Sequence, residues 1–115
     1  MVWEFIKIAG PLGGVTEGPA WDGTGLLFTH IPASKILRYD PESDRLADFR
    51  SDTNFANGLM LDTQGRLYAC EGGAQRVVRY EPHGGPTVLA DGFEGKRFNI
   101  PNDLAIDLQG RVWFT

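Results

Sequence analysis

Short apolar runs, each bounded by glycine, proline or aspartate, recur along this chain from residue 17 onward. Three segments align with one another, Glu17–Asp22, Asn57–Asp62 and Asn102–Asp107, and each is followed by a glycine turn and a second apolar run. The runs are rich in β-branched and aromatic residues, and none holds an apolar stripe of helical period over three turns. The pattern predicts strands and turns, with no helix of any length.

The repeat has the length of a small antiparallel sheet. Asp22 and Asp62 are 40 residues apart, and Asp62 and Asp107 are 45 residues apart. Such periods are typical of the four-stranded blades of a β-propeller. In the second copy the predicted strands cover 57–62, 66–71, 76–81 and 86–90. Their counterparts in the first copy cover 18–22, 26–30, 35–40 and 45–49.

The predicted organisation is therefore an all-β, partial propeller of about two and a half blades. It comprises an extra N-terminal strand within 1–14, a first blade at 15–54, a second at 55–98 and the first half of a third at 99–115. A strand before the first blade often completes the last blade of a propeller, so both ends predict a longer parent of about six blades. The alternative is a small protein that self-associates through its open sheet edges, since such edges are an aggregation hazard.

The repeat register places three polar side chains at equivalent positions. Glu17, Asn57 and Asn102 each lie five residues before the aspartate of their repeat. Because the first strand of each blade lines the central channel, the three should converge on one mouth of it. Carboxylate and amide oxygens suit Ca²⁺ or Mg²⁺, and one glutamate with neutral amides leaves positive charge on the metal to activate a carbonyl or a water. Alternatively, the asparagines cap the strand starts by local hydrogen bonds.

Charge and cysteine content narrow the partners. The net charge of −4 argues against nucleic acid. No apolar stretch approaches the roughly 18 residues of a membrane span, and Glu4 and Lys7 interrupt the apolar N-terminus, unlike a signal peptide. Cys70 is the single cysteine, which excludes an internal disulfide and fits a reducing compartment. We expect a cytoplasmic protein that binds a small molecule and neither nucleic acid nor membrane.

Several motifs resemble those of the gluconolactonase and senescence-marker protein (regucalcin) family. Thr16–Trp21 resembles its Glu-Gly-Pro-x-Trp opening, and Ala56–Asp62 is similar to the start of its second blade. Gly95–Asp103, followed by Gly110–Thr115, is similar to its Asn-x-Pro-Asn-Asp…Gly-x-x-x-Phe-Thr signature. The resemblance implies a six-bladed propeller that hydrolyses lactones of sugar acids with one divalent ion, first Ca²⁺, with Zn²⁺ or Mg²⁺ as alternatives.

The resemblance also implies roles for particular residues. Glu17 matches the metal ligand of the first blade, and Asn102 matches an asparagine that contacts substrate. Asp103, beside it in the same motif, is the catalytic candidate of this chain, and Asn57 and Asn99 are further substrate-binding candidates. The remaining metal ligands and the general base would come from later blades. The prediction is thus a truncated, metal-dependent lactone hydrolase, and whether these 115 residues are active or inactive alone stays open.

Two alternatives to this function stay open. One is a non-catalytic propeller that binds calcium or another protein, because a fold does not fix a function. The other is the related group of strictosidine-synthase-like and arylesterase-like propellers.

The remaining cysteine, histidine and aspartate residues are predicted to have structural rather than catalytic roles. Cys70 is predicted to be a buried apolar residue, and His83 a solvated turn residue. His30 is predicted to lie on the surface at the outer end of its strand. Gly72 stands where related sequences often have a histidine after Cys-Glu, so any role of that histidine is absent. Aspartates at strand-to-turn transitions favour local hydrogen bonds; those predicted to do so are Asp22, Asp62 and Asp107.

Overall fold

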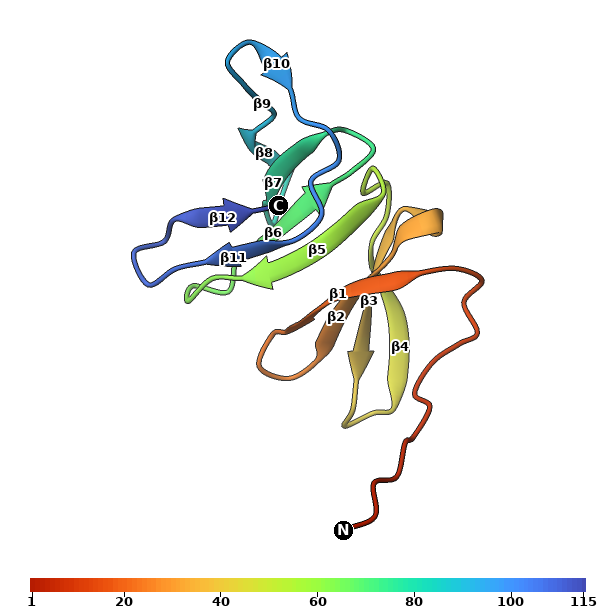
Figure 1. Ribbon diagram of the computed structural model, residues 1–115. Helices are drawn as coiled ribbons and strands as arrows, with labels where there is room; N and C mark the ends of the chain where they lie inside the picture. Colours follow the sequence, from red (N-terminus) through yellow and green to blue (C-terminus); the bar gives the residue numbers. More distant parts are fainter.

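The computed structural model describes residues 1–115 and consists of antiparallel strands (Figure 1). Sheet 1 contains β1 (Thr16–Trp21), β2 (Leu26–His30), β3 (Lys35–Asp40) and β4 (Arg45–Arg50), hydrogen-bonded in that order. Sheet 2 contains β5 (Ala56–Leu61), β6 (Leu67–Glu71), β7 (Arg76–Tyr80) and β8 (Thr87–Ala90), in the same order. The prediction of an all-β chain with four-stranded antiparallel sheets is confirmed, and each strand falls within two residues of its predicted bounds.

The rest of the chain adds two smaller pairs of strands. β11 (Leu104–Ile106) and β12 (Val112–Phe114) form sheet 3, and β9 (Gly92–Phe93) and β10 (Lys96–Arg97) form a separate hairpin. The only helical segment, Ile31–Ala33, is a three-residue turn of 3₁₀ helix. No helix of this structure has the length and apolar character to cross a membrane.

The first strands of the three sheets bring the sheets together. β1 contacts β5, and β5 contacts β11, so β5 lies between the other two first strands (Figure 1). β6 is buried at all five positions because its alternate side chains serve two different cores. Leu67 and Ala69 join the core between sheets 1 and 2, while Tyr68 and Cys70 join Leu104 in the core beside sheet 3.

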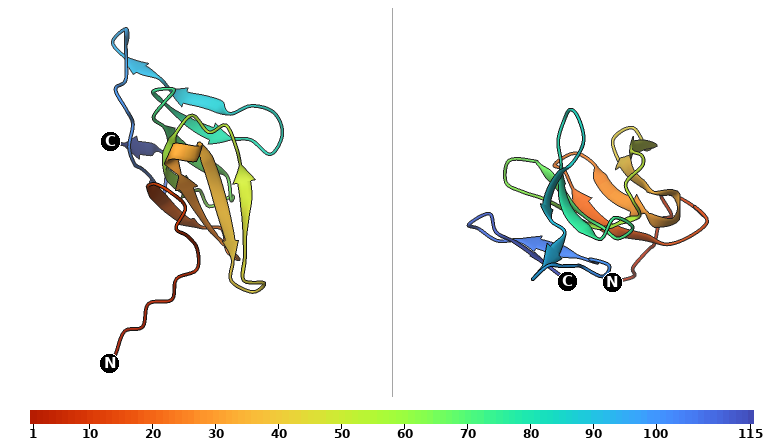
Figure 2. Two further views of the ribbon diagram at one scale, coloured as in Figure 1. Left: turned by 90° about the vertical axis from the view of Figure 1, so that its right-hand side faces the viewer. Right: turned by 90° about the horizontal axis from the view of Figure 1, so that it is seen from above.

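Residues 1–14 form no strand in the structure. Met1, Val2 and Phe5 are almost fully exposed, and the segment leads away from the sheets (Figure 2). An extended segment becomes a strand only by pairing its backbone groups with another strand, and no strand of this chain pairs with it. The predicted strand within 1–14 is therefore absent here, and its pairing with a last blade stays a prediction.

The β9–β10 hairpin was not predicted from the sequence. It occupies the longer second repeat, and Glu94 and Gly95 form its tight turn with φ values of 49° and 77°. Positive φ at both central residues is the geometry of a two-residue hairpin turn. The Arg97 guanidinium donates a hydrogen bond to the carbonyl oxygen of Ala74, over 2.6 Å, which fixes the hairpin against the β6–β7 turn.

The three repeated aspartates hold the turns after the first strands, as predicted. Asp62 accepts hydrogen bonds from the main-chain N–H of Gln64 and Arg66, from the Arg66 guanidinium and from the Tyr68 hydroxyl. Asp107 makes the equivalent set of contacts in sheet 3, with Trp113 in place of the tyrosine. These carboxylates are structural.

Candidate functional site

Four of the five predicted site residues line one hollow of about 340 Å³ where the first strands begin. The residues that line it are Glu17, Gly18, Pro19, Asn57, Gly58, Leu59, Asn102, Asp103 and Leu104. Asn99 is exposed in the segment before β11 and is not among them. The repeat register therefore brings together a glutamate, two asparagines and an aspartate from segments up to 86 residues apart (17 to 103).

Two glycines allow the first strands to approach so closely. Gly18 has a φ of 57°, and a Cβ there would overlap the carbonyl oxygen of Asn57. A Cβ on Gly58 would overlap the carboxylate of Asp103, and the Gly58 N–H donates to the Asn102 carbonyl oxygen over 2.8 Å. Only a residue without a side chain permits this backbone contact.

A β-bulge lies at the rim residue of each complete sheet. The register shifts between Glu17 and Ala20 in β1, and between Ala56 and Leu59 in β5. A bulge bends its strand and re-aims the side chains beside it. Glu17 is therefore the last regularly paired position of β1 before its bulge, and Asn57 lies within the bulge of β5.

Direct hydrogen bonds join the rim residues. The Asn57 side-chain amide donates to the side-chain oxygen of Asn102. The main-chain N–H of Asn102 donates to the carbonyl oxygen of Thr115 over 2.7 Å, and that of Thr115 donates to the carbonyl oxygen of Asp103 over 3.0 Å. Asn57 and Asn102 are thus held in place by each other, and Asn102 also by the main chain of Thr115. The side-chain oxygen of Asn57 and the side-chain N–H groups of Asn102 are not used in these bonds.

Thr29 is a buried support that sequence reasoning missed. Its hydroxyl lies 3.1 Å from the carbonyl oxygen of Glu17 and 3.0 Å from that of Asn57, so it bridges two adjacent sheets. Its side chain is fully buried in β2. A threonine in a strand is common, and its spacing gives no signal of a contact 28 residues away.

Asp103 sits at the exposed edge of the hollow. Its Oδ1 accepts a hydrogen bond from the main-chain N–H of Leu104 over 2.9 Å, which leaves Oδ2 without a partner in the structure. Burial, together with the charge of Asp103, raises the pKa of the Cys70 thiol to about 12. Cys70 is fully buried, as predicted, and remains protonated and unreactive.

The interpretation of His30 as a surface residue is wrong. β1 begins at Thr16, two residues earlier than predicted, and Thr16 pairs with His30. This pairing leaves His30 half-buried, at the same end of sheet 1 as Glu17, and its Nε2 is buried without a hydrogen-bond partner. His83 is exposed in the β7–β8 turn, as predicted.

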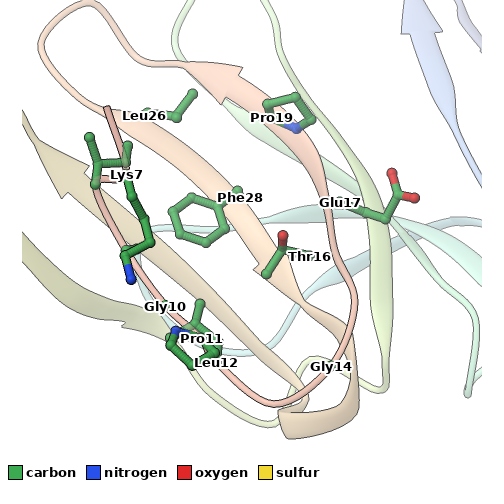
Figure 3. Close-up of a pocket in the computed structure, with 12 residues that line it drawn as sticks. Lys7, Gly10, Pro11, Leu12, Gly14, Thr16, Glu17, Pro19, Leu26 and Phe28 are labelled. Atoms are coloured by element: carbon green, nitrogen blue, oxygen red, sulfur yellow. The ribbon is translucent and has the colours of Figure 1, made fainter. Parts of the chain in front are cut away.

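A second hollow, of about 530 Å³, lies between sheet 1 and residues 7–14. Pro19, Leu26 and Phe28 give it an apolar wall, and the Glu17 carboxylate points away from it (Figure 3). This hollow offers no set of converging oxygen donors, so the polar hollow at the strand starts is the candidate site.

The donors of the polar hollow fit a hard divalent ion in kind. They are carboxylate and amide oxygens, the ligands that Ca²⁺ and Mg²⁺ prefer. The structure brings no three His, Cys, Asp or Glu side chains into a metal-binding group. The residues present therefore fit part of a coordination shell, to which Glu17 and Asp103 bring the carboxylates.

The fold and the hollow define a class of protein: an all-β chain of blade-like sheets whose first strands hold an oxygen-rich site. Residues 15–115 match the sequence model of the family described as the SMP-30/Gluconolactonase/LRE-like region. The chain belongs to that family.

Proteins similar to this chain include gluconolactonases. The chain is 28% identical over 116 residues to a gluconolactonase of Zymomonas mobilis, which covers 87% of this chain and 32% of that protein. A solved gluconolactonase structure from Xanthomonas campestris aligns with a TM-score of 0.80 and 33% identity over 87% of this chain and 34% of that one. A second structure, of a protein assigned as a gluconolactonase, aligns with a TM-score of 0.84 and 30% identity over 95% and 38%. The chain spans about a third of the length of these relatives.

Proposed function

We propose that residues 1–115 form about two and a half blades of a six-bladed β-propeller that hydrolyses lactones of sugar acids with a divalent metal ion, Ca²⁺ first. Family membership and the gluconolactonase relatives support the reaction class. The observation that carries the proposal is the hydrogen bond between Asn57 and Asn102 in the hollow that Glu17 and Asp103 also line.

This hydrogen bond assigns complementary roles to the two asparagines. Because Asn57 donates to the side-chain oxygen of Asn102, the Asn102 amide group keeps its own N–H donors for a ligand. The side-chain oxygen of Asn57 stays available as an acceptor. A lactone presents a carbonyl oxygen to a donor and ring hydroxyls to an acceptor, so the pair can orient it, with Asn99 as a further contact from the rim.

The acidic residues have separate roles in this proposal. Glu17 would hold the ion, and when bound a divalent ion supplies Lewis-acid polarisation of the lactone carbonyl. Asp103, whose Oδ2 has no partner in the structure, would accept a hydrogen bond from the attacking water and orient it. Because these donors make up only part of a shell, we propose that hydrolysis needs further residues beyond this set.

A non-catalytic role is the second candidate, and the incomplete donor set favours it. In that case the hollow would bind Ca²⁺ alone, and the exposed faces of sheets 1 and 3 would bind a protein or a second copy of the chain. Trp21 in β1 and Trp113 in β12 are more than half exposed, which supplies apolar surface for such contacts.

Calcium calorimetry and a lactone-hydrolysis assay, both on a preparation that also contains the further residues required for hydrolysis, separate the two candidates. If the protein is a lactone hydrolase, we expect Glu17→Gln to weaken Ca²⁺ binding and lactone hydrolysis together. Glu42→Gln, in the exposed β3–β4 turn, should change neither. Calcium binding without hydrolysis would favour the non-catalytic module. Equal Ca²⁺ affinity and equal hydrolysis in Glu17→Gln and the unsubstituted protein would contradict the assignment of Glu17.

A further inference from the structure

Glu71, at the end of β6, is a buried carboxylate that the proposed site does not use directly. Its side chain is 1% exposed. Its Oε2 accepts hydrogen bonds from the Arg76 guanidinium over 2.6 Å and from the Asn54 side-chain amide over 3.3 Å, and its Oε1 accepts one from the Tyr80 hydroxyl over 2.9 Å. A buried charge is tolerated only when it is paired and hydrogen-bonded, and this one is.

The cluster around Glu71 extends into sheet 1. The Arg50 guanidinium, at the end of β4, lies 4.3 Å from the centre of the Tyr80 ring. Arg50 precedes the linker that carries Asn54, so both ends of the connection between the sheets contact the same group of side chains. The cluster therefore fixes how the chain enters sheet 2.

That linker has an unusual backbone just before the rim residue Asn57. Asn54 and Phe55 have φ values of 49° and 53°, in the left-handed region that residues with a side chain seldom adopt. The carbonyl oxygen of Asn54 accepts from the Gly73 N–H over 2.9 Å, and the Phe55 N–H donates to the Ser34 hydroxyl over 3.1 Å. A conformation of this kind persists only where its surroundings impose it.

The distance from Glu71 to the site is short along the strands. Glu71 pairs directly with Ala56 across β5 and β6, and Asn57 is the next residue. Asn57 then contacts Thr29 through its carbonyl oxygen and Asn102 through its amide. Any change in the left-handed turn at 54–55 would move the start of β5 and so the Asn57 side chain.

Sheet 1 shows that a blade-like sheet forms without this cluster. His30 occupies the position of Glu71, since it pairs with Thr16 as Glu71 pairs with Ala56. The buried Nε2 of His30 has no hydrogen-bond partner, and Lys35, the counterpart of Arg76, pairs with Asp48 instead. The Glu71 cluster is therefore specific to the sheet that carries Asn57.

We infer that Glu71 is a positioning residue: through Asn54 it sets the left-handed turn that holds the Asn57 amide on Asn102. This inference rests on the proposed function for its importance in substrate binding, and on the contacts above for its geometry. The inference gives a role to the buried Glu71 carboxylate, a charged group that the apolar core of a sheet does not require.

The test is nuclear magnetic resonance of the side-chain amides in the 115-residue chain, with three variants. Glu71→Gln removes the charge at constant size, and Asn54→Gly removes the link while allowing positive φ, so the second decides if the first does not fold. Asp62→Asn is the matched control, a hydrogen-bonded carboxylate of low exposure at the other end of sheet 2. We expect loss of the Asn57–Asn102 amide contact in the first two variants and its retention in the control.

Retention of that contact in Asn54→Gly and in folded Glu71→Gln would overturn the inference, and the cluster would then serve stability alone. The proposed function fails by a different observation. It fails if an unsubstituted preparation that contains all the required residues neither binds Ca²⁺ nor hydrolyses lactones. The Asn57–Asn102 amide contact is measured independently of Ca²⁺ binding and of hydrolysis.

Discussion

Sheets 1 and 2 share their strand register and their irregularities but differ in the side chains at the end where their first strands begin. β2 pairs with β3, and β6 with β7, over five successive rungs. Each sheet has a bulge in its first strand and another between its third and fourth strands. The common strand register depends on the alternation of buried and exposed side chains and on the turn aspartates. The side chains at the end where the first strands begin can therefore differ between the two sheets.

The variation falls on equivalent positions. Glu17, Thr29 and His30 of sheet 1 correspond to Asn57, Cys70 and Glu71 of sheet 2. In sheet 1 the buried hydroxyl of Thr29 bridges to the next sheet, while in sheet 2 the buried carboxylate of Glu71 holds the linker before β5. The comparison teaches that the two sheets support the same rim by different internal contacts.

The largest difference between the sheets should follow from truncating the two equivalent residues His30 and Glu71. Glu71→Ala leaves the buried Tyr80 hydroxyl and the half-buried Arg76 guanidinium without their carboxylate partner, and removing one partner of a buried ion pair costs up to about 3–5 kcal/mol of unfolding free energy. His30→Ala removes a ring whose Nε2 has no partner, and should cost about 1 kcal/mol. Urea unfolding measures both, and equal losses would break the comparison.

The strands and the turns of both sheets follow from the sequence because they depend on local spacing. Apolar alternation marks each strand, and the repeated aspartates mark each turn. The same repeat brought Glu17, Asn57, Asn102 and Asp103 to one hollow, since equivalent positions of successive sheets converge.

The contacts that the sequence did not predict join residues from different sheets or linkers. The Glu71 cluster depends on Asn54 adopting positive φ, and the bridge of Thr29 depends on how two sheets pack. The exposure of His30 depended on a strand start displaced by two residues. Local pattern carries no information on any of these, because each is decided by packing.

The close approach of the first strands gives the second prediction. Gly58→Ala places a methyl group against the backbone of Asn102 and Asp103, so the strands must separate, at a cost of about 2 kcal/mol. Gly85→Ala, in the β7–β8 turn, meets no atom within 4 Å and is the control. Thermal unfolding of both variants tests this, and a neutral Gly58→Ala would show that the rim tolerates a wider spacing.

Loss of the hydrogen bonds by which Thr29 bridges sheets 1 and 2 should lower the unfolding free energy by a smaller amount. Thr29→Val keeps the shape of the side chain but removes its hydroxyl from the carbonyl oxygens of Glu17 and Asn57, so we expect a loss of about 1 kcal/mol. Thr87→Val, on the exposed edge strand β8, should change the unfolding free energy by less than about 0.5 kcal/mol. A loss no greater in Thr29→Val than in Thr87→Val would remove Thr29 from the support of the rim.

The turn aspartates should be the main local source of acid sensitivity in both sheets, and this is the smallest effect. Burial raises the pKa of Asp62, but the hydrogen bonds from Arg66, Gln64 and Tyr68 outweigh it and lower the pKa to about 2. A carboxyl with a lowered pKa stabilises the folded state above its unfolded pKa of about 3.9, and this is lost as the pH falls through its folded value. The melting temperature should therefore drop between about pH 4 and pH 2, and less steeply in Asp62→Asn. An identical slope in that variant would contradict the assignment.

The central claim is that Glu17, Asn57 and Asn102 form one ligand site at the strand starts. A calcium titration followed by the side-chain amide resonances of Asn57 and Asn102 tests it most directly. We predict saturable shifts of both resonances in the unsubstituted chain and much weaker ones in Glu17→Gln. Resonances that do not move, or that move equally in Glu17→Gln, would contradict the claim.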